Sequence, residues 1–325
     1  MSDANNITPS QLRDLVESAI RAPSSHNTQP WRFRIAGKQI SLLADRTRAL
    51  PVNDPDDREL TISCGCALMN LRIAAAHMGL NAMIQVMPGA ENEDLLAVVD
   101  LEGDAPGDHD LGELFDFIPE RRTYRGRFAD QALPTGVLAA LSNAVEQEGA
   151  RLHVIRDGEQ RQAVVDLVSQ GDALLWDNPS WRRELAMWMH PRRRGDGLAV
   201  PGLIAPLARA VVRSFDMGNG VAIKDQRLAE ASPVLAVLGS HRDTPAQWLA
   251  TGQALQRLLL TACRYHMQAS FLNQPIQVAA LRPKLHQLIP HAGLPQLMLR
   301  LGVAEEASPP TPRRDLTRVI DEEHE

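Results

Sequence analysis

The chain has 325 residues, about twice the length of a typical domain, which predicts two core-forming units or one large one. Hydrophobic residues make up 44% and charged residues 23%, a globular balance that excludes global disorder. The formal net charge of −6 disfavours nucleic acid and anionic lipid as main partners.

The sequence shows no sign of export or of membrane insertion. Residues 1–15 have neither a basic nor an apolar segment, so no secretory signal is expected. The longest apolar stretch, residues 197–212, is broken by two prolines and an arginine and is too short to cross a bilayer. Because the chain has only 3 cysteines, no disulfide framework is expected, and we predict a cytoplasmic protein that does not contact a membrane.

Several common cofactor and catalytic motifs are missing from the sequence. There is no G-x-G-x-x-G turn for a dinucleotide and no G-x-x-x-x-G-K-[ST] loop for a triphosphate. There is also no H-E-x-x-H, paired C-x-x-C or G-x-S-x-G. The sequence therefore predicts no bound metal and no serine nucleophile.

The first half of the chain begins with a helix and a hairpin. Residues 8–21 have apolar side chains at helical spacing, and Thr8 is suited to cap the helix. Apolar residues alternate with arginines over residues 31–35, which predicts a half-buried strand. Gly37 makes the turn, and residues 40–43 form the returning strand.

The clearest helix of the first half is expected at residues 59–79, followed by strands at 82–87 and 95–101. Within that helix Cys64 and Cys66 are two residues apart and point to nearly opposite sides. They are therefore predicted to pack in the core and not to form a redox pair.

The second half has three expected helices and three expected strands. The helices are at 133–147, 158–175 and 248–266, and the strands are at 152–155, 234–238 and 269–272. Residues 177–212 are less regular and contain Trp188 and His190. The segment also has three arginines at 192–194, and these arginines are expected in a solvated loop. This segment is either a mobile cap over a site or an insertion packed on the surface.

The two long helices are related by a shift of 187 residues, the separation of Gly65 and Gly252. The shift aligns Gly65, Ala67, Leu68, Leu71, Ala75 and Ala82 with Gly252, Ala254, Leu255, Leu258, Ala262 and Ala269. Each helix also has the same strand and loop order around it, which favours an internal duplication. We therefore expect an α+β fold of mixed or antiparallel sheets flanked by helices, with one repeat at 1–115 and a second at 116–325.

Two polar stretches are candidates for ligand binding. Residues 23–31, P-S-S-H-N-T-Q-P-W, place hydroxyls, amides, an imidazole and an indole on a loop stiffened by prolines. Such a loop either contacts a flat heteroaromatic ligand or is a polar connection with Ser and Asn caps. Residues 121–127 contain four arginines and Thr123, which can bind a phosphate or pair with the acidic stretch before them.

Together, the stretches A-P-S-S-H-N-T-Q-P-W-R-F, R-R-T-Y-R and T-P-R-R-D-L resemble the FMN-dependent nitroreductase family. The resemblance covers nearly the whole chain and is closest to the fused, internally duplicated Acg-like branch. It implies a nitroreductase-like fold in which one chain forms a pseudo-dimer with a single complete FMN site. Whether such chains associate into a further homodimer is left open.

The resemblance also implies which residues bind the cofactor. Those expected at the ring system and the ribityl chain are Ser24, Ser25, Asn27, Gln29 and Trp31. Those expected at the phosphate are Arg121, Arg122, Thr123 and Arg125, with Arg313 or Arg314. Thr123 stands where the family usually has Ser, and Ser270 is a candidate near the flavin N5.

The function implied by the resemblance is that of an FMN-dependent oxidoreductase. NAD(P)H is the transient donor, and a nitroaromatic or a quinone accepts the electrons in a ping-pong scheme through the flavin N5. The flavin carries the chemistry, so no catalytic residue is expected. The alternative is an FMN-sequestering protein in which residues 177–212 cover the flavin, with Trp188 and His190 as cap or substrate contacts.

Overall fold

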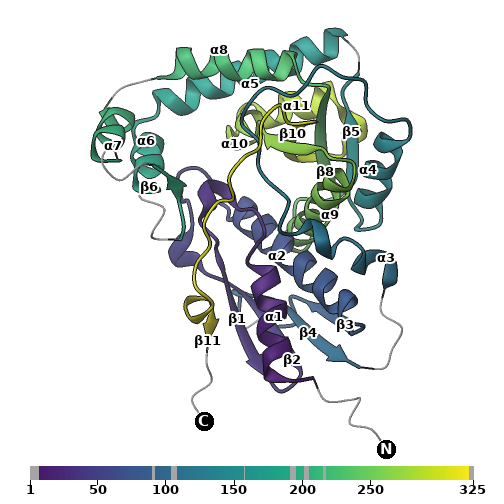
Figure 1. Ribbon diagram of the computed structural model, residues 1–325. Coiled ribbons are helices and arrows are strands. Elements are labelled where there is room, and N and C mark those ends of the chain that lie inside the picture. The colour runs from purple at the N-terminus through teal and green to yellow at the C-terminus, as the bar shows by residue number, and fades with distance from the viewer. Residues whose placement is uncertain are drawn as a thin grey trace, which may run out of the picture.

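The computed structural model describes residues 7–89, 92–103, 108–156, 158–190, 195–200, 205–214 and 217–321. The first sheet has five strands in the order β11-β1-β2-β4-β3, and the second has four strands in the order β5-β8-β10-β9. Figure 1 shows the first sheet in the lower half of the molecule and the second in the upper half. The first sheet is mixed because β11 runs parallel to β1, whereas the second is antiparallel throughout. The α+β class expected from the sequence is confirmed.

The first half forms the elements that its sequence pattern predicts. They are α1 (Pro9–Ala19), β1 (Trp31–Ala36), β2 (Gln39–Ala44), α2 (Arg58–His77), β3 (Asn81–Val86) and β4 (Leu95–Glu102). Thr8 caps α1 through a capping box with Gln11. Trp31 and Phe33 of β1 are fully buried while Arg32 and Arg34, which alternate with them, are exposed, as the alternation predicts.

The second half follows the predicted order with additions. Its longer elements are α4 (Val137–Glu146), β5 (Arg151–Val154), α5 (Gly158–Asp177), α6 (Pro179–Met187), α7 (Ala205–Ser214), α8 (Gly218–Glu230), β8 (Val234–Ser240), α9 (Pro245–Arg264), β9 (Gln268–Phe271) and β10 (Leu294–Gly302). Its shorter ones are α3 (His109–Gly112), β6 (Met189–His190), β7 (Leu198–Ala199), α10 (Gln274–Gln277), α11 (Arg282–Leu288) and β11 (Ile320–Asp321).

The expectation of irregular structure at residues 177–212 is wrong where the segment is described. It contains α6, the paired strands β6 and β7, and most of α7. The side chain of Asn178 accepts from the backbone N–H groups of Ser180 and Trp181, and Pro179 begins the helix, so a local start signal for α6 was present. The three arginines at 192–194 lie outside the described residues.

The two long helices α2 and α9 cross at glycines in the centre of the molecule. A Cβ on Gly65 would lie 2.2 Å from the backbone oxygen of Leu249, and a Cβ on Gly252 would lie 2.0 Å from that of Ile62. Ile62 and Leu249 are separated by the same 187 residues as the two glycines, so the contact is reciprocal. A reciprocal contact of this kind is the form taken by elements related by a twofold axis.

Both halves contribute to one hydrophobic core around these helices. α2 packs against the first sheet and α9 against the second, while the largest cluster of buried side chains runs from Ile7 to Ile320. Cys64, Cys66 and Cys263 are buried, and burial raises the pKa of the Cys66 thiol to about 12, which fits the packing role predicted for them. No described helix has the length and apolarity needed to span a bilayer.

The C-terminal segment returns from the second sheet to the first. It runs down the molecule from β10 and ends at β11, which pairs with β1 through Phe33 and Ile320 (Figure 1). Val319 is fully buried and its backbone oxygen accepts from the N–H of Phe33 at 2.7 Å. This return path brings residues 311–314 next to the loop at 24–29.

Candidate functional site

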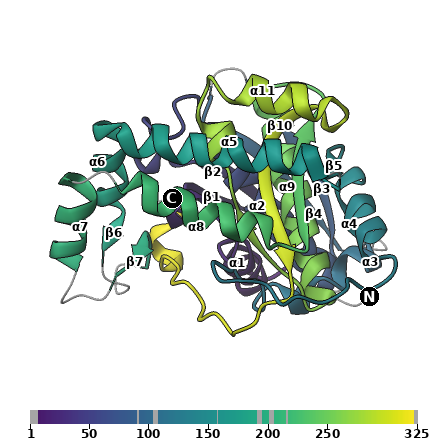
Figure 2. The ribbon, with the colours of Figure 1, turned by 90° about the horizontal axis from the view of Figure 1, so that it is seen from above.

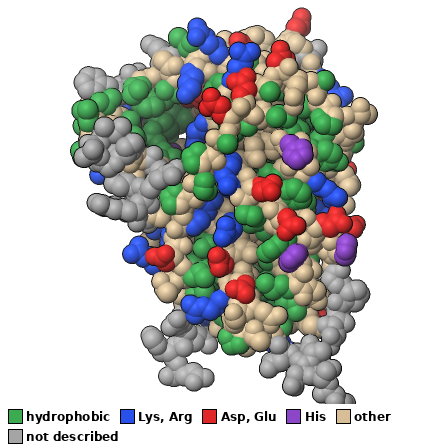
Figure 3. All heavy atoms as spheres, viewed as in Figure 1, with side chains coloured by type: hydrophobic (Ala, Val, Ile, Leu, Met, Phe, Trp, Pro, Cys, Tyr) green, Lys and Arg blue, Asp and Glu red, His purple; other side chains and the backbone are tan. Residues whose placement is uncertain are grey.

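A cavity of about 370 Å³ lies between the two halves of the chain and is a typical size for a small-molecule site. Its walls come from the loop at 23–27, the first turns of α2, residues 121–125 and residues 271–277. The helices α5, α6 and α8 close it on the remaining side; Figure 2 shows α5 and α8 lying side by side, with α6 and α7 beyond one end. Figure 3 shows basic side chains on this face of the molecule, beside a hollow.

The loop at residues 24–29 is held in an uncommon backbone conformation. His26, Asn27 and Gln29 have φ values of 50°, 55° and 53°, in the left-handed region that favours glycine. The hydroxyl of Ser24 accepts from the backbone N–H of Gln29 at 3.0 Å and so closes the loop. Residues held in this region cluster at ligand sites, because the surrounding structure must impose the conformation.

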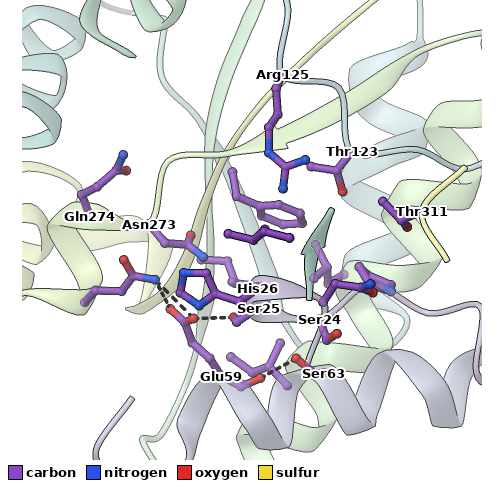
Figure 4. Close-up of a pocket in the computed structure, with 18 of the residues that line it drawn as sticks. Ser24, Ser25, His26, Glu59, Ser63, Thr123, Arg125, Asn273, Gln274 and Thr311 are labelled. Carbon is purple, nitrogen blue, oxygen red and sulfur yellow. Dashed lines mark hydrogen bonds between the residues drawn. The ribbon is translucent and has the colours of Figure 1, made fainter. Parts of the chain in front are cut away.

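A polar wall forms where this loop meets the start of α2. The buried carboxylate of Glu59 accepts hydrogen bonds from Ser25 Oγ and from Gln277 Nε2, the latter at 3.0 Å (Figure 4). Asp54 accepts from the backbone N–H groups of Glu59 and Leu60 and so caps α2. Burial and the neighbouring carboxylate of Glu59 raise the pKa of Asp54 to about 7.

His26 projects from the loop toward this wall, where it is labelled above Glu59 in Figure 4. Its Nδ1 is shielded from solvent and has no hydrogen-bond partner. Burial lowers the pKa of His26 to about 4, so the imidazole is neutral at pH 7. The cavity thus contains a neutral ring with an unused nitrogen.

The opposite part of the cavity is basic. Arg121 is only 6% exposed, and in the described part of the chain its Nε and Nη1 atoms have no hydrogen-bond partner. Within the described residues it forms no ion pair. Burial lowers the pKa of Arg121, as expected for a cation held away from water and from counter-charge.

A second cleft of about 80 Å³ adjoins this basic wall and shares Arg121, Thr123, Thr311 and Arg313 with the main cavity. Its lining adds Arg21 and Arg122. Arg313 donates to the backbone oxygens of residues 20–22 and has its pKa lowered to about 9, by burial and by the arginines around it. In Figure 4 Thr123 and Thr311 lie on this side, and Arg125 points into the cavity from above.

The structure brings most of the predicted cofactor-binding residues to these two hollows. The main cavity is lined by Ser24, Ser25, Asn27, Arg121, Thr123, Arg125 and Arg313, and the second cleft by Arg122. Outside both lie Gln29, Trp31, Ser270 and Arg314, although Phe271 and Asn273, which follow Ser270, do line the cavity.

Gln29 lies away from the cavity because its amide is used inside the protein. Its Oε1 accepts from the backbone N–H of Arg314 at 2.9 Å, and its Nε2 donates to the backbone oxygen of Gly195 at 2.8 Å. Asn27 Nδ2 likewise donates to the backbone oxygens of Gly197 and Pro312, both at 3.3 Å. These amides fasten the segment at 195–197 and the C-terminal segment to the loop.

Trp188 and His190, the predicted cap contacts, do not line the cavity. The Arg48 guanidinium carbon lies 5.3 Å from the Trp188 ring centroid, and His190 Nε2 lies 3.2 Å from Asp196 Oδ1. The cap residues that line the cavity are Trp181 and Leu198.

Trp181 and Glu184 dock α6 onto the loop that precedes α2. Trp181 Nε1 donates to Asn53 Oδ1 at 2.9 Å. The buried carboxylate of Glu184 accepts from the backbone N–H groups of Val52 and Asn53 at 2.8 and 2.9 Å. α6 is therefore fixed by directed hydrogen bonds and not only by apolar contact.

Sequence reasoning missed several lining residues. They are His26, Glu59, Asp172, Asp225, Gln274, Gln277 and Thr311. His26 and Thr311 lie inside stretches that the sequence did single out. The others lie on α2, α5, α8 and α10, and no spacing along the chain links these helices.

Comparison with known proteins gives a consistent result. A family model described as "Putative TM nitroreductase" matches residues 1–82. A Mycobacterium tuberculosis protein named "Putative NAD(P)H nitroreductase" is 29% identical over 323 residues, covering 95% of this chain and 91% of its own. Another protein of that organism, described as uncharacterized, is 31% identical over 324 residues, covering 95% of this chain and 92% of its own. The crystal structure of an FMN and NADPH-dependent nitroreductase from a Sphigopyxis species aligns with a TM-score of 0.44 and 19% identity, over 65% of this chain and 99% of its own.

Proposed function

The chain belongs to the nitroreductase family, and from this premise we propose that it binds FMN in the cavity and acts as an NAD(P)H oxidoreductase. The mycobacterial relative is named for nitroreductase activity with NAD(P)H, and the Sphigopyxis enzyme for its dependence on FMN and NADPH. A nitroaromatic or a quinone is the proposed electron acceptor.

The observation that carries the proposal is the buried Arg121, which lacks a counter-charge. A buried cation without a partner is strongly destabilising, so its place in a fold is best explained by an anion that binds there. A phosphate group accepts several hydrogen bonds from a guanidinium at once and suits the free Nε and Nη1 atoms. Thr123, Thr311 and Arg313 share the same wall and would complete the phosphate site.

The rest of the cavity suits the remainder of FMN. The hydroxyls of Ser24 and Ser25 and the unused Nδ1 of His26 offer hydrogen-bonding groups to a polar ring system. When bound, FMN supplies hydride acceptance from NAD(P)H and hydride donation to the second substrate. The chain's own residues would hold the phosphate, keep a neutral imidazole beside the ring and exclude water with α5, α6 and α8.

We further propose that the chain is a pseudo-dimer of the repeats 1–115 and 116–325 with one FMN site. The reciprocal contact of Gly65 and Gly252 supports this arrangement. The cavity also takes its lining from both repeats, with Ser24 and Glu59 from the first and Arg121 from the second. A measured content near two flavins per chain would contradict the single site.

Arg121→Gln tests the phosphate assignment. We expect the parent chain to purify with close to one FMN, and this variant to bind FMN at least about tenfold more weakly because a charged hydrogen-bond donor is lost. Flavin absorbance after desalting measures the content, and circular dichroism checks the fold. Arg127→Gln is the matched control, since Arg127 is exposed and lines neither hollow. A parent chain that refuses added FMN would overturn the function.

A second candidate function is favoured by the hydrogen bonds that fix the cap. If α6 stays docked through Glu184, NAD(P)H cannot reach the flavin and the chain stores FMN instead of turning it over. Glu184→Ala loosens this contact, and Arg183→Ala changes an exposed side chain of the same helix.

An anaerobic NAD(P)H titration of the parent and both variants separates the two functions. Rapid bleaching of the parent flavin supports the oxidoreductase. Storage is supported if the parent flavin is bleached by dithionite but not by NAD(P)H. In that case NAD(P)H should bleach the flavin of Glu184→Ala faster, but not that of Arg183→Ala.

A further inference from the structure

The cavity has an acidic end that the cofactor proposal does not use. Asp172 of α5 and Asp225 of α8 both line it, and both accept a hydrogen bond from Gln274 Nε2, at 3.1 and 3.0 Å. The three side chains come from helices that pack on one another. A Cβ on Gly171 would lie 2.7 Å from Gln274 Cβ, so the absence of a side chain there lets α5 approach this closely.

Two acceptor atoms in this cluster remain without a donor. Asp172 is only 3% exposed, and its Oδ2 has no hydrogen-bond partner among the residues that the structure describes. Gln274 Oε1 is likewise shielded and unpartnered. Within the described residues neither carboxylate forms an ion pair. Buried acceptors without donors are uncommon in folded proteins, because each loses its hydration without replacement.

Electrostatics and shape both point to a cation as the missing partner. Burial and the nearby Asp225 raise the pKa of Asp172 to about 7, and burial raises the pKa of Asp225 although Arg300 and Lys224 lower it, so a cation bound between the two carboxylates would stabilise both. Trp176 and Trp181 line the same cavity with their rings edge to face, 5.4 Å between centroids. Carboxylates beside aromatic faces form a setting that binds organic cations. The described residues contain no cluster of three His, Cys, Asp or Glu that would favour a metal ion instead.

We propose that Asp172, Asp225 and Gln274 bind the positively charged nitrogen of a flat aromatic substrate, such as a protonated amine or an amidine. This inference rests on the proposed function, because it names the class of acceptor that the same site takes. Asn273 and Gln274 lie on one side of the cavity and Thr123 and Thr311 on the other, while Arg125 points in from above (Figure 4). The anionic cofactor and the cationic substrate would thus be drawn to different sides. A neutral or anionic compound leaves the two acceptors unsatisfied, which produces specificity.

The test uses three 4-nitrophenyl compounds of similar size and different charge: 4-nitrobenzylamine, 4-nitrobenzyl alcohol and 4-nitrobenzoate. Their binding to the purified full chain is measured by calorimetry without a reductant, and flavin content is counted separately. We expect the amine to bind at least about tenfold more tightly than the alcohol, and the benzoate to bind most weakly. Asp172→Asn and Asp225→Asn should each reduce the preference for the amine, whereas Asp166→Asn, an exposed change on α5, should not.

Each outcome decides one of the two proposals. The cation site is overturned if the three compounds bind equally, if none of them binds, or if the preference for the amine is unchanged in both cavity variants. None of these outcomes contradicts an FMN content of one per chain. A chain that prefers the amine but binds no FMN overturns the proposed function and leaves the cation site standing. Circular dichroism and the flavin content of the variants exclude loss of the fold.

Discussion

At the scale of single residues, the cavity is defined by buried polar groups whose hydrogen-bonding capacity is incomplete. Arg121 keeps two free donors, while Asp172 keeps a free acceptor and His26 a free ring nitrogen. Groups of this kind lower stability in the empty protein and gain most from a ligand. Stability and ligand binding should therefore be coupled at these positions.

Asp172→Asn should stabilise the empty protein in a pH-dependent way. The folded-state pKa of about 7 lies above the ordinary 3.8, so the carboxylate favours the unfolded state increasingly as the pH rises from about 4 to 7. The advantage of the variant in free energy of unfolding should grow by about 2 kcal/mol between pH 5 and pH 8. Urea unfolding at both pH values measures it. A constant difference, or an equal change in the exposed control Asp166→Asn, would contradict the assignment.

The sequence could point to residues of one cavity only where they are neighbours along the chain. Ser24, Asn27 and Arg121 belong to short dense motifs, and the structure places all three on the cavity. Gln29 belongs to the same motif, yet its amide pairs with backbone 166 and 285 residues away. Asp172 and Asp225 had no signal at all, because only the packing of α5 against α8 brings them together.

At the scale of elements, the crossing of α2 and α9 holds the two sheets together. The backbones meet at Gly65 and Gly252 because neither carries a side chain, and Cys66 donates from its thiol to the backbone oxygen of Gly252 at 3.1 Å. Elements with sustained periodicity, such as these helices, were predictable within a few residues. The strand β11 has two residues and depends wholly on a partner far along the chain, so no local pattern could reveal it.

Gly65→Ala should be severely destabilising. Its methyl group would meet backbone atoms that cannot move aside without separating the helices, so we expect a loss of at least about 3 kcal/mol in free energy of unfolding. Gly220→Ala is the control, because that helical glycine has open space around it and alanine should stabilise α8 by about 0.5–1 kcal/mol. Thermal unfolding of both variants measures the contrast. A Gly65→Ala protein as stable as the parent would show that the helices do not need this close approach.

At the scale of the whole molecule, the chain behaves as one body with a shared core. The first sheet takes its edge strand β11 from the end of the chain, and the cavity takes lining from both halves. The largest core cluster spans the boundary expected near residue 115, so this boundary does not separate two independent cores. Length and patterning predicted two repeats, whereas the exchange of the C-terminal segment between sheets follows only from their packing.

Unfolding of the parent chain should occur in one cooperative step. Val319→Ala should lower the free energy of unfolding by about 2 kcal/mol, because it leaves a cavity where the C-terminal segment meets the first sheet. Thr317→Ala, an exposed change two residues earlier, should have little effect. Coincident urea transitions by tryptophan fluorescence and far-ultraviolet circular dichroism test the cooperativity. Two separated transitions would mean that the halves unfold independently.

The return of the C-terminal segment has a consequence for biosynthesis. While the chain is being translated, β1 stays an open sheet edge until Ile320 has been added, and open edges invite pairing with other chains. The same late segment supplies Thr311 and Arg313 to the basic wall of the cavity. A nascent protein that stops before this point would therefore be prone to aggregation and unable to load its cofactor. Bound flavin would then distinguish chains that contain this segment from chains that lack it.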